Sequence, residues 1–144
     1  MNLATLKAHL QSAITSGIEE VTLDYLFDYL QVKNKDKAYP IIVVDIGNES
    51  SAVGDIRDGS ISTLETWIYC VGLVTPEADQ TPGQLASWDA LEVELKAYLN
   101  NLQSMSALPI ETTVKDLPKR YIPSGFLIER ETAVAYKIKI TMHC

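Results

Sequence analysis

Hydrophobic residues near the start of the chain recur at a spacing typical of a helix, and they are Leu3, Leu6, Leu10 and Ile14. Asn2 is a suitable N-cap, and Ser16 and Gly17 are typical of a helix end. The segment 18–33 fits two periods. Leu23, Leu26, Phe27 and Leu30 fit a helix, whereas Val21, Leu23, Tyr25, Phe27 and Tyr29 alternate as in a strand. We favour a helix for 18–33 and keep a strand as the alternative.

Two apolar runs in the middle of the chain predict buried strands. The first, AYPIIVVDIG, begins at Pro40, which has no N–H for a sheet ladder, and ends at Gly47. The second covers residues 62–74. Its alternation would place Leu64, Ile68, Cys70 and Val74 on one face, and Glu65, Trp67, Tyr69, Val71 and Leu73 on the other. Residues 47–60 between the two runs are rich in glycine, serine and acidic residues, which predicts a loop.

A long amphipathic helix is predicted over residues 82–103. Thr81 and Gln84 match a capping box, and Pro82 suits the first helical position, where its missing N–H costs nothing. Glu92 and Lys96 have the spacing of a helical ion pair. The apolar stripe consists of Leu85, Trp88, Leu91, Leu95, Leu99 and Leu102. We expect this stripe to pack on a sheet.

The last third of the chain predicts strands separated by a loop. Residues 109–117 predict a short strand or a sheet edge, and residues 118–125, PKRYIPSG, predict a basic loop bounded by two prolines. The segments FLIERE and AVAYKIKITMHC predict two further strands. In the second of them, Val134, Tyr136, Ile138, Ile140 and Met142 would face a core, and Ala133, Ala135, Lys137, Lys139 and Thr141 would face solvent.

This order of elements predicts an α+β fold for a single domain that covers residues 1–144. The sheet is expected to be mostly antiparallel. The long helix (about 82–103) would pack on one face of it, with a short N-terminal helix beside the sheet.

Charge is sorted along the chain. Ten acidic residues and one basic residue lie between Asp45 and Glu94, whereas seven basic and four acidic residues follow from Lys96 to the end. The net charge is −7, which disfavours broad binding to nucleic acid or to an anionic membrane. A molecule with an acidic middle and a basic end is suited to head-to-tail association between copies, which builds rings or filaments.

The sequence offers no convincing constellation for catalysis, for a metal or for a cofactor. His9 and His143 lie at opposite ends of the chain, without metal-ligand spacing around them. The acidic segment holds Asp45, Glu49, Asp55 and Asp58, but it lacks the ligand spacing of a calcium loop. We therefore predict no enzymatic activity and no cofactor. Of the two cysteines, Cys70 is expected to be a buried apolar residue and Cys144 a free thiol.

Lys115, Lys119, Arg120 and Tyr121 form the one local cluster of basic and aromatic residues. A solvated loop is the simplest interpretation, and a contact for phosphate or for an acidic partner surface is the functional one. The acidic partner surface could be that of residues 45–94 in a second copy. On this hypothesis, the subunit interface comprises Asp45, Glu49, Asp55, Asp58, Lys115, Lys119, Arg120 and Tyr121.

The order of four segments resembles the tail-terminator (tail-completion, or neck) proteins of long-tailed bacteriophages and prophages. The segments are YPIIVVDIG, ETWIYCVGLV, QLASWDALEVELKAYLNNL and the final strand AVAYKIKITM. The resemblance implies a non-enzymatic protein that closes into a ring, typically six-fold, on the last ring of the tail tube. Its partners would be further copies of itself, the tail-tube protein and the head-connector protein.

The resemblance also implies that DNA passes through the ring without specific binding and that no membrane is involved. The protein would reside in the virion, and in the host cytoplasm during assembly; the segment MNLATLKAHL lacks the pattern of a signal peptide. Two alternatives remain. One is a monomeric α+β binding module whose acidic surface (45–94) recruits a basic protein partner. The other is a small enzyme with a carboxylate site in residues 45–58.

Overall fold

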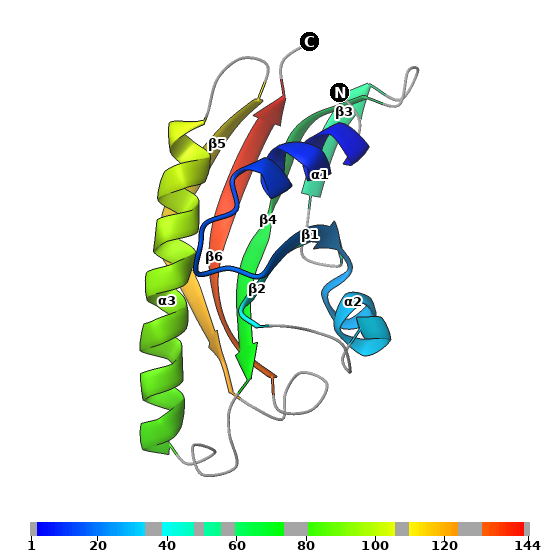
Figure 1. Ribbon diagram of the computed structural model, residues 1–144. Helices are drawn as coiled ribbons and strands as arrows, with labels where there is room; N and C mark the ends of the chain where they lie inside the picture. Colours follow the sequence, from blue (N-terminus) through cyan, green and yellow to red (C-terminus); the bar gives the residue numbers. More distant parts are fainter. Residues whose placement is uncertain are drawn as a thin grey trace.

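The computed structural model describes residues 3–33, 39–47, 51–55, 60–73, 81–105, 110–123 and 131–142. The elements in chain order are α1 (Leu3–Ser12), β1 (Glu20–Asp24), α2 (Leu26–Lys33), β2 (Ile41–Asp45), β3 (Ser51–Asp55), β4 (Ser60–Leu73), α3 (Thr81–Ser104), β5 (Ile110–Ile122) and β6 (Glu131–Met142). The predicted α+β fold is confirmed: a mostly antiparallel sheet carries a long helix and a short N-terminal helix (Figure 1).

The six strands form one curled sheet in the order β1-β2-β4-β6-β5, and β3 pairs with the first half of β4 (Figure 1). The pairing of β1 with β2 is parallel, and the other pairings are antiparallel. Strand β6 lies between β4 and β5, so the C-terminal segment is central to the sheet. The main path of the sheet therefore ends in two different strands, β1 and β5.

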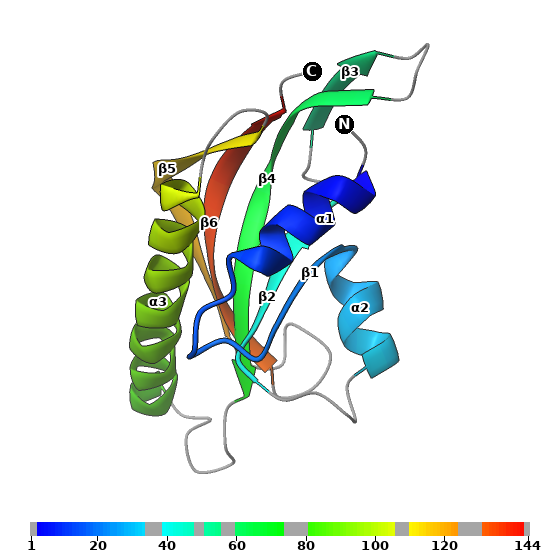
Figure 2. The ribbon, with the colours of Figure 1, turned by 45° about the horizontal axis from the view of Figure 1, so that its top comes forward.

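Helices cover the sheet unequally on its two faces. On the first face, α1 and α3 close a large core (Figure 2) that includes Leu10, Leu95, Leu102, Ile68 and Ile138. On the second face, α2 lies near β1 and β2 and closes a smaller core that includes Leu30, Ile41, Val43, Tyr69 and Ala135. Strand β2 is apolar on both faces, as its unbroken apolar run predicts, because it contributes to both cores.

The alternation predicted for β4 is confirmed. Leu64, Ile68 and Cys70 pack in the first core, and Trp67, Tyr69 and Val71 in the second. In β6 the predicted core face is also found for Val134, Tyr136, Ile138 and Ile140, but the opposite face is wrong in part. Ala133 and Ala135 are fully buried in the second core. Burial of this face of β6 was not expected, because α2 had not been separated from β1 in the sequence.

Helix α3 extends one residue beyond the predicted 82–103 at each end. Leu91, Leu95, Leu99 and Leu102 are buried as predicted. Leu85 is 52% exposed, because it lies in the first turns of the helix, away from the first core. Tyr98 is fully buried next to the stripe, and its hydroxyl donates a hydrogen bond to the carbonyl of Leu10 (2.7 Å), which ties α3 to α1.

The helix favoured for 18–33 is wrong for its first half. Residues 20–24 form β1, which sends Val21 and Leu23 into the first core, and the helix begins only at Leu26. Both hydrophobic periods are therefore real, each over part of the segment. Helix α1 is also shorter than expected, since it ends at Ser12 and leaves Ile14 43% exposed.

Two predicted loops contain strands. Residues 51–55 form β3, which pairs with Ser60–Glu65 of β4. Strand β5 continues through the predicted loop as far as Ile122, with a register shift between Lys115 and Lys119. That shift accommodates Pro118, since proline is tolerated at bulges and on edge strands. Most of FLIERE, together with Asn2, Val74, His143 and Cys144, lies outside the described residues.

Candidate interaction surfaces

Asp45, the first of the predicted acidic contacts, is engaged within its own subunit. It lies at the end of β2 and is buried. Its Oδ1 accepts hydrogen bonds from the backbone N–H of Leu26 (3.3 Å) and of Gly47 (2.9 Å). The first of these places a carboxylate at the N-terminus of α2, where it satisfies an otherwise unpaired amide and suits the helix dipole. Asp45 thus acts as a cap for α2.

The other predicted acidic contacts are less fully placed. Asp55 ends β3, where its backbone lies opposite Ser60 of β4. Glu49 and Asp58 lie outside the described residues. The structure therefore does not assemble these four acids into one described surface.

The predicted basic cluster is divided between the two faces of the sheet. Lys119 is paired with Tyr136 and Tyr121 with Val134, so both lie on the first face. Arg120 is paired with Ala135 and lies on the second face. Lys115 lies opposite Lys137 in the ladder. This division follows from the strand conformation of 119–122, because successive side chains in a strand point to opposite faces.

On the first face, Lys119 is part of a polar network with α3. Its Nζ lies 2.9 Å from Oε1 of Glu92, and the hydroxyl of Tyr136 donates to the same oxygen. The hydrogen bond from Tyr136, and then the ammonium of Lys119, hold the pKa of the Glu92 carboxyl below its usual value. Burial, and then the hydrogen bond to Glu92, raise the pKa of Tyr136 to about 12.

An aromatic pair adjoins this network. The rings of Trp88 and Tyr121 lie 5.3 Å apart between centroids. The indole N–H of Trp88 donates to the hydroxyl of Thr132 (2.8 Å). Lys119 and Tyr121 thus help to join β5 to α3, which differs from the free contact surface that the sequence suggested.

On the second face, three basic side chains form a surface that we call the basic patch: Arg120, Lys137 and Lys139. The guanidinium carbon of Arg120 lies 3.9 Å from the centroid of the Trp67 ring, and Nζ of Lys137 lies 5.8 Å from it. Such stacking fixes the direction of a cation while it leaves the charge in place. Lys139 is exposed and lies opposite Glu65 of β4 in the ladder, and within the described part of the chain it forms no ion pair.

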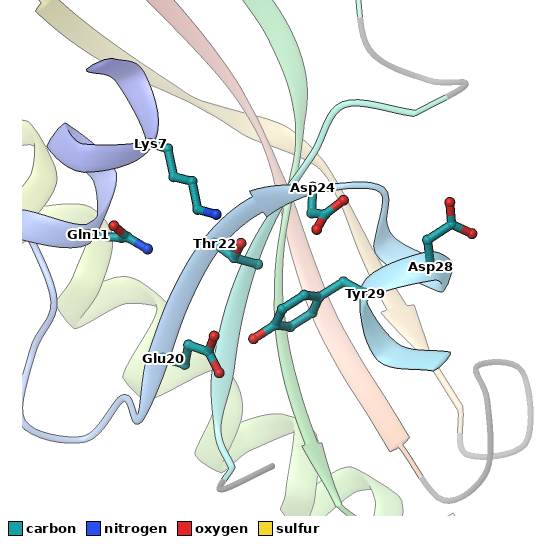
Figure 3. A pocket seen from close by; sticks show the side chains of 7 residues that line it. All are labelled: Lys7, Gln11, Glu20, Thr22, Asp24, Asp28 and Tyr29. Carbon is teal, nitrogen blue, oxygen red and sulfur yellow. The ribbon is translucent and has the colours of Figure 1, made fainter. Parts of the chain in front are cut away.

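A pocket that the sequence did not predict lies at the opposite end of the sheet. It has a volume of about 330 Å³ and lies between α1, β1 and α2 (Figure 3). We call it the acidic pocket, because three carboxyl groups and one ammonium group line it. Its lining residues are Lys7, Gln11, Glu20, Thr22, Asp24, Asp28 and Tyr29.

The side chains of the acidic pocket come from both sides of the edge strand. Lys7 and Gln11 extend from α1, and the ring of Tyr29 points from α2 toward Glu20 (Figure 3). The side-chain amide of Gln11 donates to the backbone carbonyl of Val21 (3.1 Å), on the outer edge of β1. Sequence analysis missed this site because its acids lie in the first 44 residues, where the charges nearly balance.

Other chemically distinctive groups are part of the packing. Burial raises the pKa of the Cys70 thiol to about 12, as expected of a buried apolar cysteine. His9 is half-buried, and burial lowers its pKa. Among the described residues, no three His, Cys, Asp or Glu side chains gather closely enough to hold a metal ion. No helix in the described part of the chain is long and apolar enough to cross a membrane.

Comparison with known proteins gives no assignment: neither the protein-family models nor the curated proteins contain a match to this chain.

Proposed function

We propose that this protein is a non-enzymatic structural subunit that assembles head to tail into a closed ring at the end of a phage tail tube. The ring, typically of six copies, stops growth of the tube and joins the tail to the head connector. In the virion it contacts the tail-tube protein and the head-connector protein, and DNA passes through it without specific binding. The resemblance in element order motivates this proposal.

The observation that carries the proposal is the asymmetry of the sheet. The sheet is open, and its main path ends in two unlike strands: a short parallel strand, β1, and a long antiparallel strand, β5. A face of β5 and β6 bears positive charge, while acidic side chains surround β1. Association of unlike surfaces is heterologous, and it closes into a ring when the rotation between neighbours divides a full turn.

Passage of DNA is compatible with the overall charge. The net charge of −7 gives a ring of several copies a strongly negative total. Binding to DNA gains most of its free energy when basic side chains release counterions from phosphates. A largely acidic ring would therefore let DNA pass without retaining it.

A monomeric binding module is the second candidate function. The acidic pocket favours it, because three carboxyl groups around a recess would suit a basic side chain of another protein. The predicted acidic surface, 45–94, supports it less, since Asp45 caps α2 and Glu92 binds Lys119 within the subunit. The two functions differ in a property that is simple to measure, the mass of the particle in solution.

The test is the molar mass by light scattering over a concentration series, at low and at moderate salt, with negative-stain images of any large species. We expect one closed ring whose mass is a fixed multiple of that of the chain. It should dissociate as salt rises, because salt screens the charges between copies. A monomer at every concentration up to the solubility limit, at both salt concentrations, would contradict the self-assembling ring and favour the binding module.

A further inference from the structure

The acidic pocket has the chemistry of a receptor for a basic side chain. Its formal charge is −2 at neutral pH, from three carboxyl groups and one ammonium group. Asp28 is exposed, and Asp24 and Glu20 are partly exposed, so an incoming cation reaches the carboxyl groups from solvent. Tyr29 lines the pocket from α2, but only 6% of its surface is exposed, so the carboxyl groups and not its ring provide the contact for a cation.

The matching charge lies at the other end of the same sheet. β1 begins the strand order, and β6 and β5 end it, so the acidic pocket and the basic patch do not overlap. Lys139 projects from the basic patch as an exposed ammonium, while Arg120 and Lys137 are held beside Trp67. One molecule therefore presents both halves of a complementary pair. A mutual two-fold dimer would use up both halves in two copies, whereas a head-to-tail contact leaves one half free at each end for further copies, as a ring of more than two subunits requires.

The edge of β1 favours docking by side chains over the addition of a strand. An outer carbonyl of this edge, that of Val21, already accepts the hydrogen bond from Gln11. Lys7 extends from the same helix over the edge (Figure 3). Such a covered and charged edge disfavours pairing with an incoming strand. What remains accessible beside it is the recess between β1 and α2, lined by carboxyl groups.

From these observations we infer that the acidic pocket of one copy receives the basic patch of the next copy, with Lys139 as its leading cation. The inference rests on the proposed ring, and it names the surfaces that would form each contact in it. It replaces the acidic surface 45–94 with residues Glu20, Asp24 and Asp28 as the partner of the basic strands.

Charge reversal on each side of the contact tests this inference. Asp28→Lys and Lys139→Glu are made singly and together in the full-length chain, and self-association is followed by light scattering. We expect each single variant to weaken association at least about tenfold, because like charges then meet in every contact. The double variant restores opposite charges and should recover association close to that of the wild type. Asp28→Asn, which removes the charge without reversing it, should give an intermediate loss.

Asp89→Lys is the matched control, since Asp89 is an exposed acid on α3 that does not line the pocket. It makes the same change in net charge as Asp28→Lys and should assemble like the wild type. Circular dichroism and thermal unfolding establish that each variant is folded. If the wild type forms rings and Asp28→Lys forms them equally well, the pocket contact is wrong while the ring stands.

Two further outcomes would also overturn the inference. One is a double variant that does not recover self-association, although the control variant Asp89→Lys assembles. The other is an Asp28→Lys variant that still forms rings but no longer binds a poly-lysine probe that the wild type binds. That result would assign the pocket to a different basic partner. A wild type that stays monomeric refutes the ring itself, so failure of the proposed function is distinguishable from failure of this contact.

Discussion

Single side chains on α3 connect segments that are far apart in the sequence. Tyr98 donates to the carbonyl of Leu10, and the side-chain amide of Asn101 donates to the carbonyl of Ala13 (2.7 Å). Trp88 binds Thr132 on β6, and Glu92 binds Lys119 on β5 and Tyr136 on β6. Each of these bonds satisfies a polar group at the edge of the apolar core, where an unpaired group would be costly. The same helix thereby fixes α1 and the β5–β6 pair.

The Glu92 network predicts a specific dependence of stability on pH. The pKa of Glu92 is lowered by folding, so its contribution to the free energy of unfolding is present above the usual carboxyl value of 4.5 and is lost as pH falls through the folded value. We expect Glu92→Gln to lower the free energy of unfolding by about 1–2 kcal/mol at neutral pH, because it removes a charge-assisted acceptor that is only 14% exposed.

The measurement is urea unfolding of wild type and Glu92→Gln in steps from neutral to acid pH. The difference between the two proteins should shrink as Glu92 of the wild type becomes protonated. Asp89→Asn, at an exposed position of the same helix, serves as the control and should show little difference at any pH. A difference for Glu92→Gln that stays constant through the acid range would show that its charge does not support the network.

At the scale of elements, the sequence predicts an element correctly where its segment has one clear hydrophobic period. Helix α3 and strands β4 and β6 carry long, unmixed hydrophobic patterns, and the structure confirms their type and their core faces. The segment 18–33 carries two periods, because a strand and a helix follow each other there and because Leu23 and Phe27 fit both patterns. No local sequence signal shows where the strand ends and the helix begins. This boundary depends on the pairing of β1 with β2, which is a tertiary contact.

Strands β3 and β5 were missed in whole or in part for a related reason. β3 has five residues, SAVGD, of which only two are apolar and larger than glycine, so its pairing with β4 decides its conformation. In β5, Pro118 suggested a loop because proline usually interrupts a ladder. The register shift between Lys115 and Lys119 absorbs that proline and lets the strand continue.

The crossing of α3 over β4 depends on a glycine. A Cβ atom at Gly72 would lie 2.8 Å from Cδ2 and 3.3 Å from Cδ1 of Leu91, a buried residue of α3. We predict that Gly72→Ala lowers the free energy of unfolding by about 1–3 kcal/mol, because the methyl group forces Leu91 away from its place in the core. Leu91→Ala alone should cost about 2–5 kcal/mol, since it leaves a cavity.

A double-mutant cycle separates this steric clash from other effects of the substitutions. If the clash is the cause, Gly72→Ala/Leu91→Ala is more stable than the sum of the two single losses predicts, because each change relieves the other. The free energies of unfolding in urea give the coupling directly. Simple additivity of the two losses would mean that a clash with Leu91 is not the cause of the destabilisation by Gly72→Ala.

At the scale of the whole molecule, the acidic and basic segments of the sequence do not form separate acidic and basic surfaces in the structure. The acidic middle is partly engaged within the subunit through Asp45 and Glu92, and the basic end is divided between two faces by strand alternation. The acids that gather into a pocket come from a segment whose charges nearly balance in sequence. The general idea of unlike, oppositely charged surfaces was within reach of the sequence, but the residues that form them depend on the strand order.

Head-to-tail contact between the acidic pocket and the basic patch predicts rescue by mixing. In a pure sample of Asp28→Lys, two cations meet in every contact, and in a pure sample of Lys139→Glu two anions meet. When the two variants alternate around a ring, each contact pairs opposite charges again. At one contact the native Asp28 meets the native Lys139, and at the next the introduced lysine at position 28 meets the introduced glutamate at position 139. We therefore expect an equimolar mixture to assemble under conditions in which neither variant assembles alone.

Native mass spectrometry of the mixed particles measures their composition. An alternating ring contains an even number of subunits and equal numbers of the two variants, whereas independent folding defects in the variants would not be repaired by mixing. Mixing either variant with Asp89→Lys provides the control, because that pairing restores no contact at the reversed surface. A mixture that behaves as the sum of its two components would show that Asp28 and Lys139 do not meet across a subunit boundary, whatever ring the wild type forms.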